Sequence, residues 1–329
     1  MPAVVRRELR GDPASIGRWH AGALNNGVVF GATCSGVSRL PRWCSYGIGH
    51  VGTWIAYRLM RRGTHAVIEN LRSVRPDASD DELRRLALKT YRTYARDTID
   101  FLRSLDMSRA QFQTLVAADN AGALDAVLAL GRGVILVGGH FGNWELGGLA
   151  LRTFKGCAVT VVGRPEPSPA VGRLRRRMRE RFGIESVDIG HLFETALQLR
   201  RALAANTVVA MLIDRHFGRD RHDVVFFDRQ TPFLRSPALM AGMSGAPLLP
   251  ASMIRQPDGR FVGWFGTPVF VDSAVGGDDA LRRATQAVAT QLEEQIRAYP
   301  HLWYQFYPYW QDERPASARL DLAAARQQG

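Results

Sequence analysis

Residues 133–145 read GVILVGGHFGNWE, and this stretch decides how the chain is expected to fold. The apolar run 133–137 has the length and composition of a buried strand, and the residues after Glu145 continue as LGGLAL, which is typical of a helix. Gly138 and Gly139 separate the two segments and permit a tight connection. The stretch therefore predicts a strand-to-helix junction with His140 at the turn.

The spacing of His140 and Glu145 predicts a base with an acidic partner. Two side chains five positions apart in one helix point about 140° away from each other. The pair can meet only if His140 precedes the helix and Glu145 lies in its first turns. A carboxylate-oriented histidine is suited to taking a proton from a hydroxyl group. An isolated His–Glu pair is more often a structural contact, and what favours catalysis here is its place at the carboxyl end of a strand.

The rest of the chain predicts helices first and then alternating strands and helices. Residues 15–75 read as helical, and Ser79 with Glu82 forms a capping box that begins a further helix. From residue 120 the alternation favours an α/β fold. The predicted helices are 122–130, 143–154, 170–182, 191–205, 236–244 and 278–298, and the predicted strands are 133–137, 157–162, 207–213, 248–254 and 260–271.

The composition of the chain points to acidic partners. It has 329 residues, 46% of them hydrophobic, and 43 Lys and Arg against 31 Asp and Glu, giving a formal net charge of +12. This is enough for a sizeable core. A basic surplus favours contact with nucleic acid, an anionic membrane surface or phosphorylated substrates. The three cysteines form no C-x-x-C pair, so a disulfide framework or a zinc site is not expected, and a reduced, cytosol-facing location fits better.

The N-terminal region suits a membrane interface better than a membrane span. Residues 21–38 carry no charge but include two asparagines and several glycines, which is weak for a span that needs about 20 apolar residues. Residues 44–57 are shorter. Both segments could instead lie in the interface, or form ordinary packed helices. The expected ring anchors are Trp43, Tyr46, Trp54 and Tyr57, with Arg58, Arg61 and Arg62 beside them.

Two more predicted strands end in polar side chains. Arg164 follows strand 157–162 and could anchor a phosphate or a carboxylate, unless it simply lies in solvent. Asp214 ends strand 207–213 and could brace either the histidine or an arginine from a neighbouring loop. The loop 226–232 leads into the helix that begins at Ser236, where backbone amides could hold an anion or the serine could merely cap the helix.

Two other functions remain open on the residues alone. Asp214, His216 and His222, with Asp220 and Asp223 nearby, could form the metal cluster of a metal-dependent phosphoesterase, although their spacing matches no familiar ligand set. The arginine-rich run 173–181 could face anionic lipid or nucleic acid, which leaves a non-enzymatic nucleic-acid-binding protein as the other alternative. No serine-hydrolase elbow, phosphate-binding P-loop or dinucleotide fingerprint occurs.

The ordered set of motifs resembles one family. His140-x4-Glu145 after a hydrophobic strand resembles the H-x4-D/E motif of the lysophospholipid acyltransferase superfamily. The order of the other motifs resembles the branch that holds the lipid A late (lauroyl or myristoyl) acyltransferases and the phosphatidylinositol mannoside acyltransferases. The resemblance covers roughly residues 40–310, and it departs at Asp228, where the family often has glycine, and at the C-terminal aromatic run, which lacks basic residues. The further motifs are Asn70-Leu71, Gly163-Arg164-Pro165, Ile213-Asp214-Arg215, Phe226-Phe227 with Thr231-Pro232, Ala238-Leu239-Met240-Ala241 and Gly245-Ala246-Pro247-Leu248-Leu249-Pro250.

The resemblance implies a central mixed, mainly parallel sheet flanked by helices in an α/β domain over 76–312, after a helical, membrane-interfacial region over 1–75 and before a polar tail over 313–329. It implies acyl transfer from acyl-CoA or acyl carrier protein to a hydroxyl of a glycolipid or phospholipid, with no cofactor, metal or nucleic acid. It also implies peripheral or monotopic attachment to the cytoplasmic face of a bacterial inner membrane, through contact with anionic lipid. His140 would be the general base and Glu145 its orienting acid. The supporting or substrate-binding residues would be Asn143, Arg164, Asp214, Arg215 and Arg235.

Overall fold

A mainly parallel sheet forms the centre of the molecule. The computed structural model describes residues 40–310, except for 105, 119–120, 165–168 and 190–191. Within these residues seven strands form one sheet, and all neighbours run parallel except β8 and β9. The predicted fold class is therefore confirmed at the level of a mixed α/β sheet flanked by helices. Across the sheet the order is β1 (Val116–Ala118), β9 (Phe261–Phe265), β8 (Leu248–Arg255), β2 (Val134–Gly138), β5 (Val208–Leu212), β3 (Val159–Gly163) and β4 (Ile184–Asp188).

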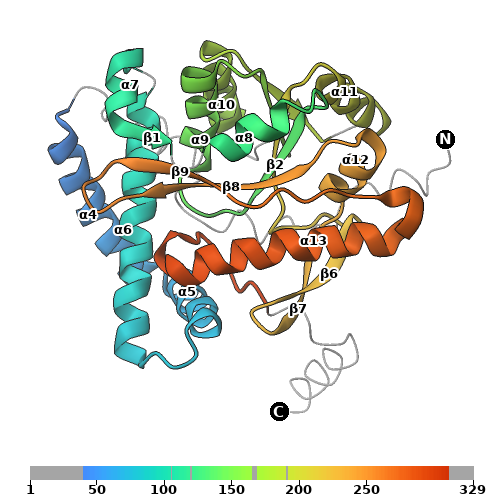
Figure 1. The fold of residues 1–329 in the computed structure, drawn as a ribbon. Helices are drawn as coiled ribbons and strands as arrows, with labels where there is room; N and C mark the ends of the chain where they lie inside the picture. Colours follow the sequence, from blue (N-terminus) through green and yellow to red (C-terminus); the bar gives the residue numbers. More distant parts are fainter. Residues whose placement is uncertain (1–39, 105, 119–120, 165–168, 190–191, 311–329) are drawn as a thin grey trace, which may run out of the picture.

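Helices cover both faces of this sheet (Figure 1). Alternate residues of β2 pack on opposite faces of the sheet. Ile135 and Val137 belong to one core cluster, and Val134 and Leu136 belong to the other. Because both faces are buried, the strand reads as a continuous apolar run. One face carries α11 (Leu192–Ala204), α12 (Ser236–Ser244) and α13 (Ser273–Ala298); the other carries α7 (Arg109–Leu115), α8 (Gly122–Leu128), α9 (Trp144–Ala150) with a π-helical turn (Leu151–Lys155), and α10 (Pro169–Arg181).

Most predicted helices and strands are confirmed within a few residues, but one region was wrongly read as a loop. Residues 221–234 form an antiparallel hairpin of β6 (Arg221–Phe226) and β7 (Arg229–Leu234). Its two-residue turn places Phe227 and Asp228 at φ of 52° and 59°, a left-handed conformation that favours glycine or asparagine. The turn therefore lacks the usual sequence signal. Strands β1 and β4 were also missed, and the strand expected over 260–271 ends at Phe265.

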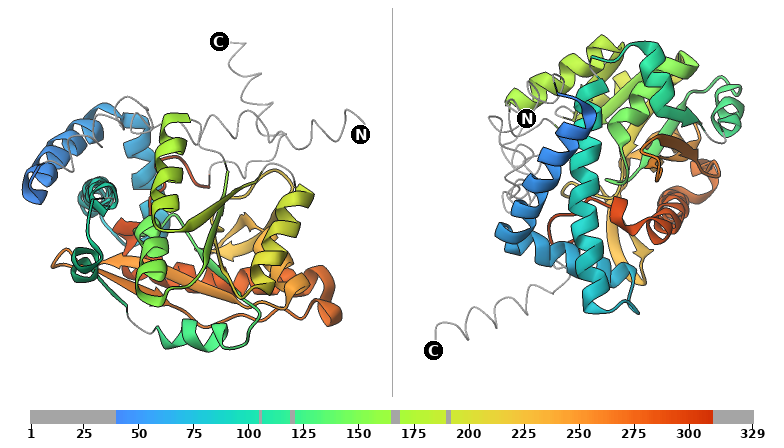
Figure 2. Two further views of the ribbon diagram at one scale, coloured as in Figure 1. Left: turned by 90° about the horizontal axis from the view of Figure 1, so that it is seen from above. Right: turned by 90° about the vertical axis from the view of Figure 1, so that its left-hand side faces the viewer.

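Three helices, α4 (Arg42–Leu59), α5 (Arg61–Val74) and α6 (Asp80–Ser104), stand at the side of the sheet (Figures 1 and 2). The predicted capping box is present at α6, where the Ser79 amide donates to Glu82 over 2.8 Å. None of the described helices is both long and apolar enough to span a membrane. Residues 15–39 of the expected helical region 15–75, including the uncharged segment 21–38, lie outside the described residues, as does the tail 313–329.

A buried charged network ties these helices to the sheet. Arg255 on β8 donates to Asp97 over 2.7 Å and to Asp100 over 2.6 Å, and both acids are on α6. Arg42 on α4 also donates to Asp100, over 2.9 and 2.8 Å. Burial raises the pKa of Asp97 to about 6, although Arg255 opposes the shift. The Tyr304 hydroxyl donates to Asp97 over 2.6 Å, which connects the network to the C-terminal segment beside His140.

Candidate active site

The turn between β2 and α9 holds His140 at the carboxyl end of the central strand. Gly142 has φ of 61°, and a Cβ atom there would collide with the carbonyl oxygen of Met253 on β8. Only glycine fits this close approach without strain. The chain then enters α9 through Asn143, whose side-chain oxygen accepts from the Leu146 amide over 3.3 Å. The predicted junction is confirmed, and a helix cap and a glycine fix its path.

The imidazole of His140 is paired with Asp214. His140 Nδ1 lies 2.7 Å from Asp214 Oδ1, and the His140 backbone amide donates to Asp214 Oδ2 over 2.8 Å. The His140 side chain is 18% exposed, whereas Asp214 is completely buried behind it. Burial lowers the pKa of His140, the positive charge of Arg215 adds to this, and Asp214 opposes it only in part. The geometry therefore presents a neutral imidazole with a fixed ring orientation.

Asp214 also accepts hydrogen bonds from the C-terminal segment. Gln305 Nε2 donates to Asp214 Oδ2 over 2.7 Å, and Trp303 Nε1 donates to the same oxygen over 3.4 Å. Burial alone would raise the pKa of Asp214, but His140 and the positive charge of Arg215 outweigh it, so the net shift of the pKa is downward. Because Oδ2 is occupied by these donors, Oδ1 is the oxygen that receives the proton of Nδ1.

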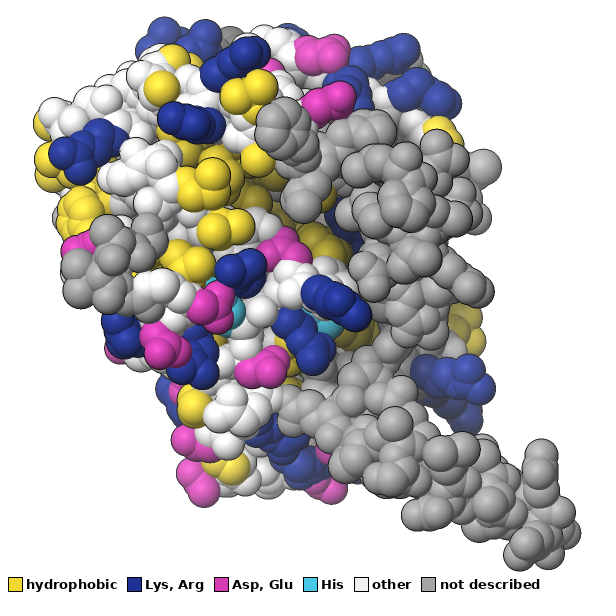
Figure 3. Space-filling view, turned by 90° about the vertical axis from the view of Figure 1, so that its right-hand side faces the viewer, with side chains coloured by type: hydrophobic (Ala, Val, Ile, Leu, Met, Phe, Trp, Pro, Cys, Tyr) yellow, Lys and Arg dark blue, Asp and Glu magenta, His cyan; other side chains and the backbone are white. Residues whose placement is uncertain are grey.

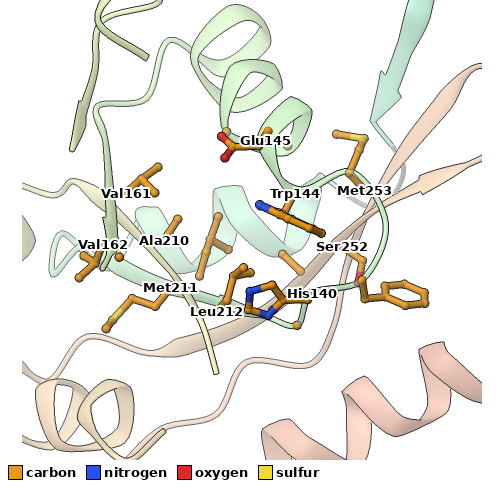
Figure 4. A pocket seen from close by; sticks show the side chains of 18 of the residues that line it. His140, Trp144, Glu145, Val161, Val162, Ala210, Met211, Leu212, Ser252 and Met253 are labelled. Atoms are coloured by element: carbon orange, nitrogen blue, oxygen red, sulfur yellow. The ribbon is translucent and has the colours of Figure 1, made fainter. Parts of the chain in front are cut away.

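The structure gives Glu145 a different partner from the one expected. The Glu145 carboxylate accepts from Arg179 on α10, with Nη2 at 2.9 Å from Oε1 and 3.2 Å from Oε2. Figure 4 shows His140 and Glu145 on opposite sides of the Trp144 ring in that view. The reason is helical geometry: Trp144 packs on the His140 ring, and the next residue is turned by about 100° towards α10. The acid that contacts His140 Nδ1 is thus Asp214, which the sequence had indicated as a possible brace for the histidine.

A cavity of about 890 Å³ opens beside His140, between the sheet and α9. Its walls are largely apolar, as in sites for lipids and other small ligands. Small residues create the space, because a larger side chain at these positions would fill it. They are Gly138, Gly163, Ala210, Ala251 and Gly263 on the sheet, and Gly147 and Gly148 on α9. Figure 3 shows hydrophobic side chains gathered in a hollow on one face, with Lys and Arg side chains around it.

Two of the other predicted residues reach the cavity and two do not. Arg164 and Arg215 line it: Arg164 stacks on Phe217, with 5.0 Å from its Cζ to the ring centre, and Arg215 donates to Gln305 Oε1 over 2.9 Å. Asn143 is buried as the α9 cap and donates to the Asp97 carbonyl over 2.9 Å, outside the cavity wall. Arg235 lies outside that wall as well and is paired with Asp278 at 2.9 Å.

The proposed metal cluster is not assembled. Asp214 contacts His140, whereas His222 contacts Thr285 at 3.0 Å and Asp278 at 3.4 Å. Across the described part of the chain, no three His, Cys, Asp or Glu side chains gather as metal ligands would. The geometry therefore gives no support to the phosphoesterase alternative.

Comparison with known proteins identifies the family of this chain. The family model for bacterial lipid A biosynthesis acyltransferases matches residues 26–312. The chain belongs to this family. It is 30% identical over 254 residues to the phosphatidylinositol mannoside acyltransferase of Mycobacterium tuberculosis strain H37Rv, covering 76% of this chain and 77% of that protein. The enzyme of the same name from Mycolicibacterium smegmatis is 29% identical over 292 residues, covering 85% and 91%. The lipid A biosynthesis lauroyltransferase of Escherichia coli is 28% identical over 232 residues, covering 68% and 72%. The predicted family and the predicted acyltransferase class are confirmed.

Some residues that build the site of this acyltransferase gave no sequence signal. Trp303 and Gln305 support Asp214, and the Tyr309 hydroxyl donates to the Asp214 carbonyl over 2.7 Å. They lie in an aromatic run after the last helix, which by itself reads only as hydrophobic. Arg175 and Arg179 of the arginine run line the cavity, whereas the sequence had suggested only anionic lipid or nucleic acid as what this run faces.

Proposed function

We propose that this acyltransferase moves a fatty acyl chain from a thioester to a hydroxyl of a glycolipid, with His140 as general base and Asp214 as its orienting acid. One observation carries the proposal: the His140–Asp214 pair lies at the wall of a large apolar cavity at the carboxyl edge of a parallel sheet. Such edges are where α/β proteins bind ligands. A base next to an apolar cavity is what transfer of a lipid chain requires.

The chemistry follows from the tautomer. With the Nδ1 proton directed at Asp214, Nε2 takes the proton of the acceptor hydroxyl while its oxygen attacks the thioester carbonyl. The carbon–sulfur bond then breaks, and the imidazolium returns the proton to the leaving thiolate. Asp214 stabilises the transient imidazolium, and no covalent acyl-enzyme or cofactor is required. The donor would be acyl-CoA or acyl carrier protein.

The cavity would hold the acyl chain. Each methylene group removed from water stabilises the bound chain by about 0.8 kcal/mol. His140 and the small residues of the sheet and of α9 line the same cavity. Binding energy from this remote part of the substrate can position the thioester carbonyl beside the base.

The experiment that tests the function is direct. Purified enzyme is given a palmitoyl thioester and, separately, a mannosylated phosphoinositide or a lipid A precursor, and the products are followed by mass spectrometry. The proposal expects one acceptor to gain the mass of one acyl chain with release of free thiol. It fails if neither acceptor is acylated, or if the His140→Gln variant acylates at the wild-type rate.

The pH dependence should report the lowered pKa of His140. Because burial and Arg215 lower the pKa of His140 below its ordinary value of 6.5, the imidazole stays neutral into mildly acidic solution. Activity is therefore retained as the pH falls past 6.5 and is lost only on passing the lowered pKa. In a profile of kcat/KM against pH, we expect the acid limb to have its midpoint below 6.5. A midpoint above 6.5 would show that the charge of Asp214 prevails over burial.

The outer face of α4 is proposed to contact the membrane. Trp43, Ile48, Val51 and Leu59 are 76%, 64%, 62% and 77% exposed, and the sequence from residue 40 to 68 contains no Asp or Glu. Trp54 is also exposed, under the guanidinium of Arg58. Of the four expected ring anchors, only the tryptophans face outwards. Tyr46 donates to Asp100 over 2.6 Å, and Tyr57 packs against Tyr91. An apolar stripe with arginines and no acids fits an anionic lipid surface.

Replacing the two tryptophans should release the protein from lipid. We expect the Trp43→Ser/Trp54→Ser variant to bind vesicles containing anionic lipid at least roughly tenfold more weakly, because two interfacial rings are lost. Sedimentation with vesicles measures this. The matched control is Phe270→Ser, whose ring is 63% exposed on another part of the molecule. An equal loss of vesicle binding in the double variant and the control, or unchanged vesicle binding in the double variant, would contradict membrane contact through α4.

A further inference from the structure

Helix α10 turns one arginine-rich face towards the cavity. Gly172, Arg175, Arg176 and Arg179 line the cavity at helical spacing, while Met178 on the same helix is buried in the core. Arg177 is exposed and does not line the cavity. The arginine run is therefore divided into residues that serve the site and residues that face solvent.

Glu145 binds two of these arginines at once. Arg179 approaches it side-on, with Nη2 at 2.9 Å from Oε1 and Nε at 3.4 Å from Oε2, and Arg175 Nη1 lies 3.8 Å from Oε1. The three side chains are largely withdrawn from water, at 11% exposure for Glu145, 19% for Arg179 and 24% for Arg175. Arg179 and Arg175 lower the pKa of Glu145 against the effect of burial, so the carboxylate is ionised. It therefore fixes the positions of both guanidinium groups at the cavity wall.

Basic side chains outnumber acidic ones in the described wall of the cavity, although Lys155 is paired with Asp125 outside it at 2.6 Å. The wall contains seven Lys and Arg side chains and two Asp and Glu side chains. One of the two acids, Asp188, is already paired with Arg176 at 2.9 Å. Guanidinium groups that are partly removed from water are stabilised by an anion, and their planar donor pairs match the geometry of phosphate. An acyl chain and a neutral sugar would not require this charge.

We propose that Arg175 and Arg179, positioned by Glu145, bind a phosphate group of a substrate while its reacting group lies at His140. This rests on the proposed acyl transfer and extends it to the headgroup or carrier. Both substrates can supply the phosphate: the donor through its carrier arm, and the acceptor through a phospholipid headgroup. Glu145 thereby positions the two arginines, whereas Asp214 is the acid that orients the general base His140.

The sharpest variant is Arg175→Gln, because it removes one cavity-lining guanidinium and leaves the closer Glu145–Arg179 pair intact. The control is Arg177→Gln, which makes the same change of charge on the same helix outside the cavity. A second variant, Glu145→Gln with Arg179→Gln, removes the charge of both members of the pair, so that neither of the two is left as an unpaired buried charge. Its circular dichroism and melting temperature would show whether it folds.

Binding is measured by titration calorimetry in a His140→Gln background, with two matched pairs of probes. The first pair is a non-hydrolysable thioether analogue of palmitoyl-CoA and the same analogue on pantetheine without phosphate. The second pair is dioctanoyl phosphatidylinositol and dioctanoylglycerol. Since no turnover is needed, a failure of the acyl-transfer assay and a failure of this binding test are separate results.

We expect Arg175→Gln to lower the affinity for one phosphate-bearing probe by roughly tenfold or more. The affinity for its phosphate-free counterpart should change by no more than about twofold. The double variant should behave in the same way and the Arg177→Gln control should not. Loss confined to the CoA pair assigns the phosphate to the donor, and loss confined to the phosphatidylinositol pair assigns it to the acceptor. The proposal is overturned if Arg175→Gln lowers the affinity for phosphate-bearing and phosphate-free probes equally, or for no probe. It is also overturned if the Arg177→Gln control loses as much affinity.

Discussion

The His140→Gln variant is expected to lower kcat by about 10²–10⁴-fold, the usual contribution of a positioned base. Glutamine cannot take a proton from a hydroxyl at neutral pH, so the attack must proceed from the alcohol itself. Its amide can still donate to Asp214, whose other donors, Gln305 and Trp303, remain in place. We therefore expect the melting temperature and the affinity for the thioether donor analogue to stay close to wild type. Single-turnover release of thiol from a palmitoyl thioester measures the effect.

The outcome separates a chemical role from a structural one. A loss of kcat with unchanged ligand affinity and a cooperative melt assigns His140 to the reaction. If the variant melts early, or if its affinity for the donor analogue collapses with its turnover, His140 is a packing residue and the mechanism is wrong.

The Asp214→Asn variant should approach the same low activity, although it leaves the base in place. Asp214 Oδ2 accepts from the His140 amide at 2.8 Å and from Gln305 at 2.7 Å, so the single oxygen of asparagine belongs at that position. Its NH₂ group then faces Nδ1 as a donor. The imidazole must carry its proton on Nε2, where it cannot accept one from the substrate. In a Ser–His–Asp enzyme the corresponding change costs about 10⁴-fold in kcat.

Three comparisons make this prediction specific. The double variant with His140→Gln should be no slower than the slower single variant, because both changes disable one base. Nitrogen NMR of labelled histidine should show the Nε2–H tautomer in Asp214→Asn and the Nδ1–H tautomer in the wild type. Glu145→Gln should keep the wild-type tautomer. A change of tautomer in Glu145→Gln, with none in Asp214→Asn, would return the orienting role to Glu145.

The fold was predictable where local rules act alone. The apolar run before Gly138, the capping box at Ser79 and the alternation of strands and helices each depend on neighbours in sequence, and each is confirmed. The β6–β7 hairpin was missed because its left-handed turn is built from Phe227 and Asp228. The sequence pattern there could not distinguish a tight turn from a loop.

The sequence allowed us to predict which residues lie at the strand ends, but not which of their side chains contact one another. His140, Arg164 and Asp214 come to one edge of the sheet because the strands that carry them are parallel neighbours. Which acid meets the imidazole depends on positions 74 residues apart and on the rotation of one helix, so the local spacing of His140 and Glu145 favoured the nearer acid. Gln305 could not be identified because its importance depends entirely on packing against Asp214.

The segment that carries Trp303, Gln305 and Tyr309 has a consequence for biosynthesis. Gln305, 91 positions after Asp214 in the chain, donates to the Asp214 carboxylate, and the backbone amide of Tyr304 donates to the His140 carbonyl over 2.8 Å. A nascent chain can contain the strands that carry His140 and Asp214 before residues 303–309 emerge, but until then the His140–Asp214 pair lacks its supporting donors. A chain cut short before Trp303 would therefore lack the donors that hold Asp214, and we expect such a product to be catalytically inert even where its sheet has formed.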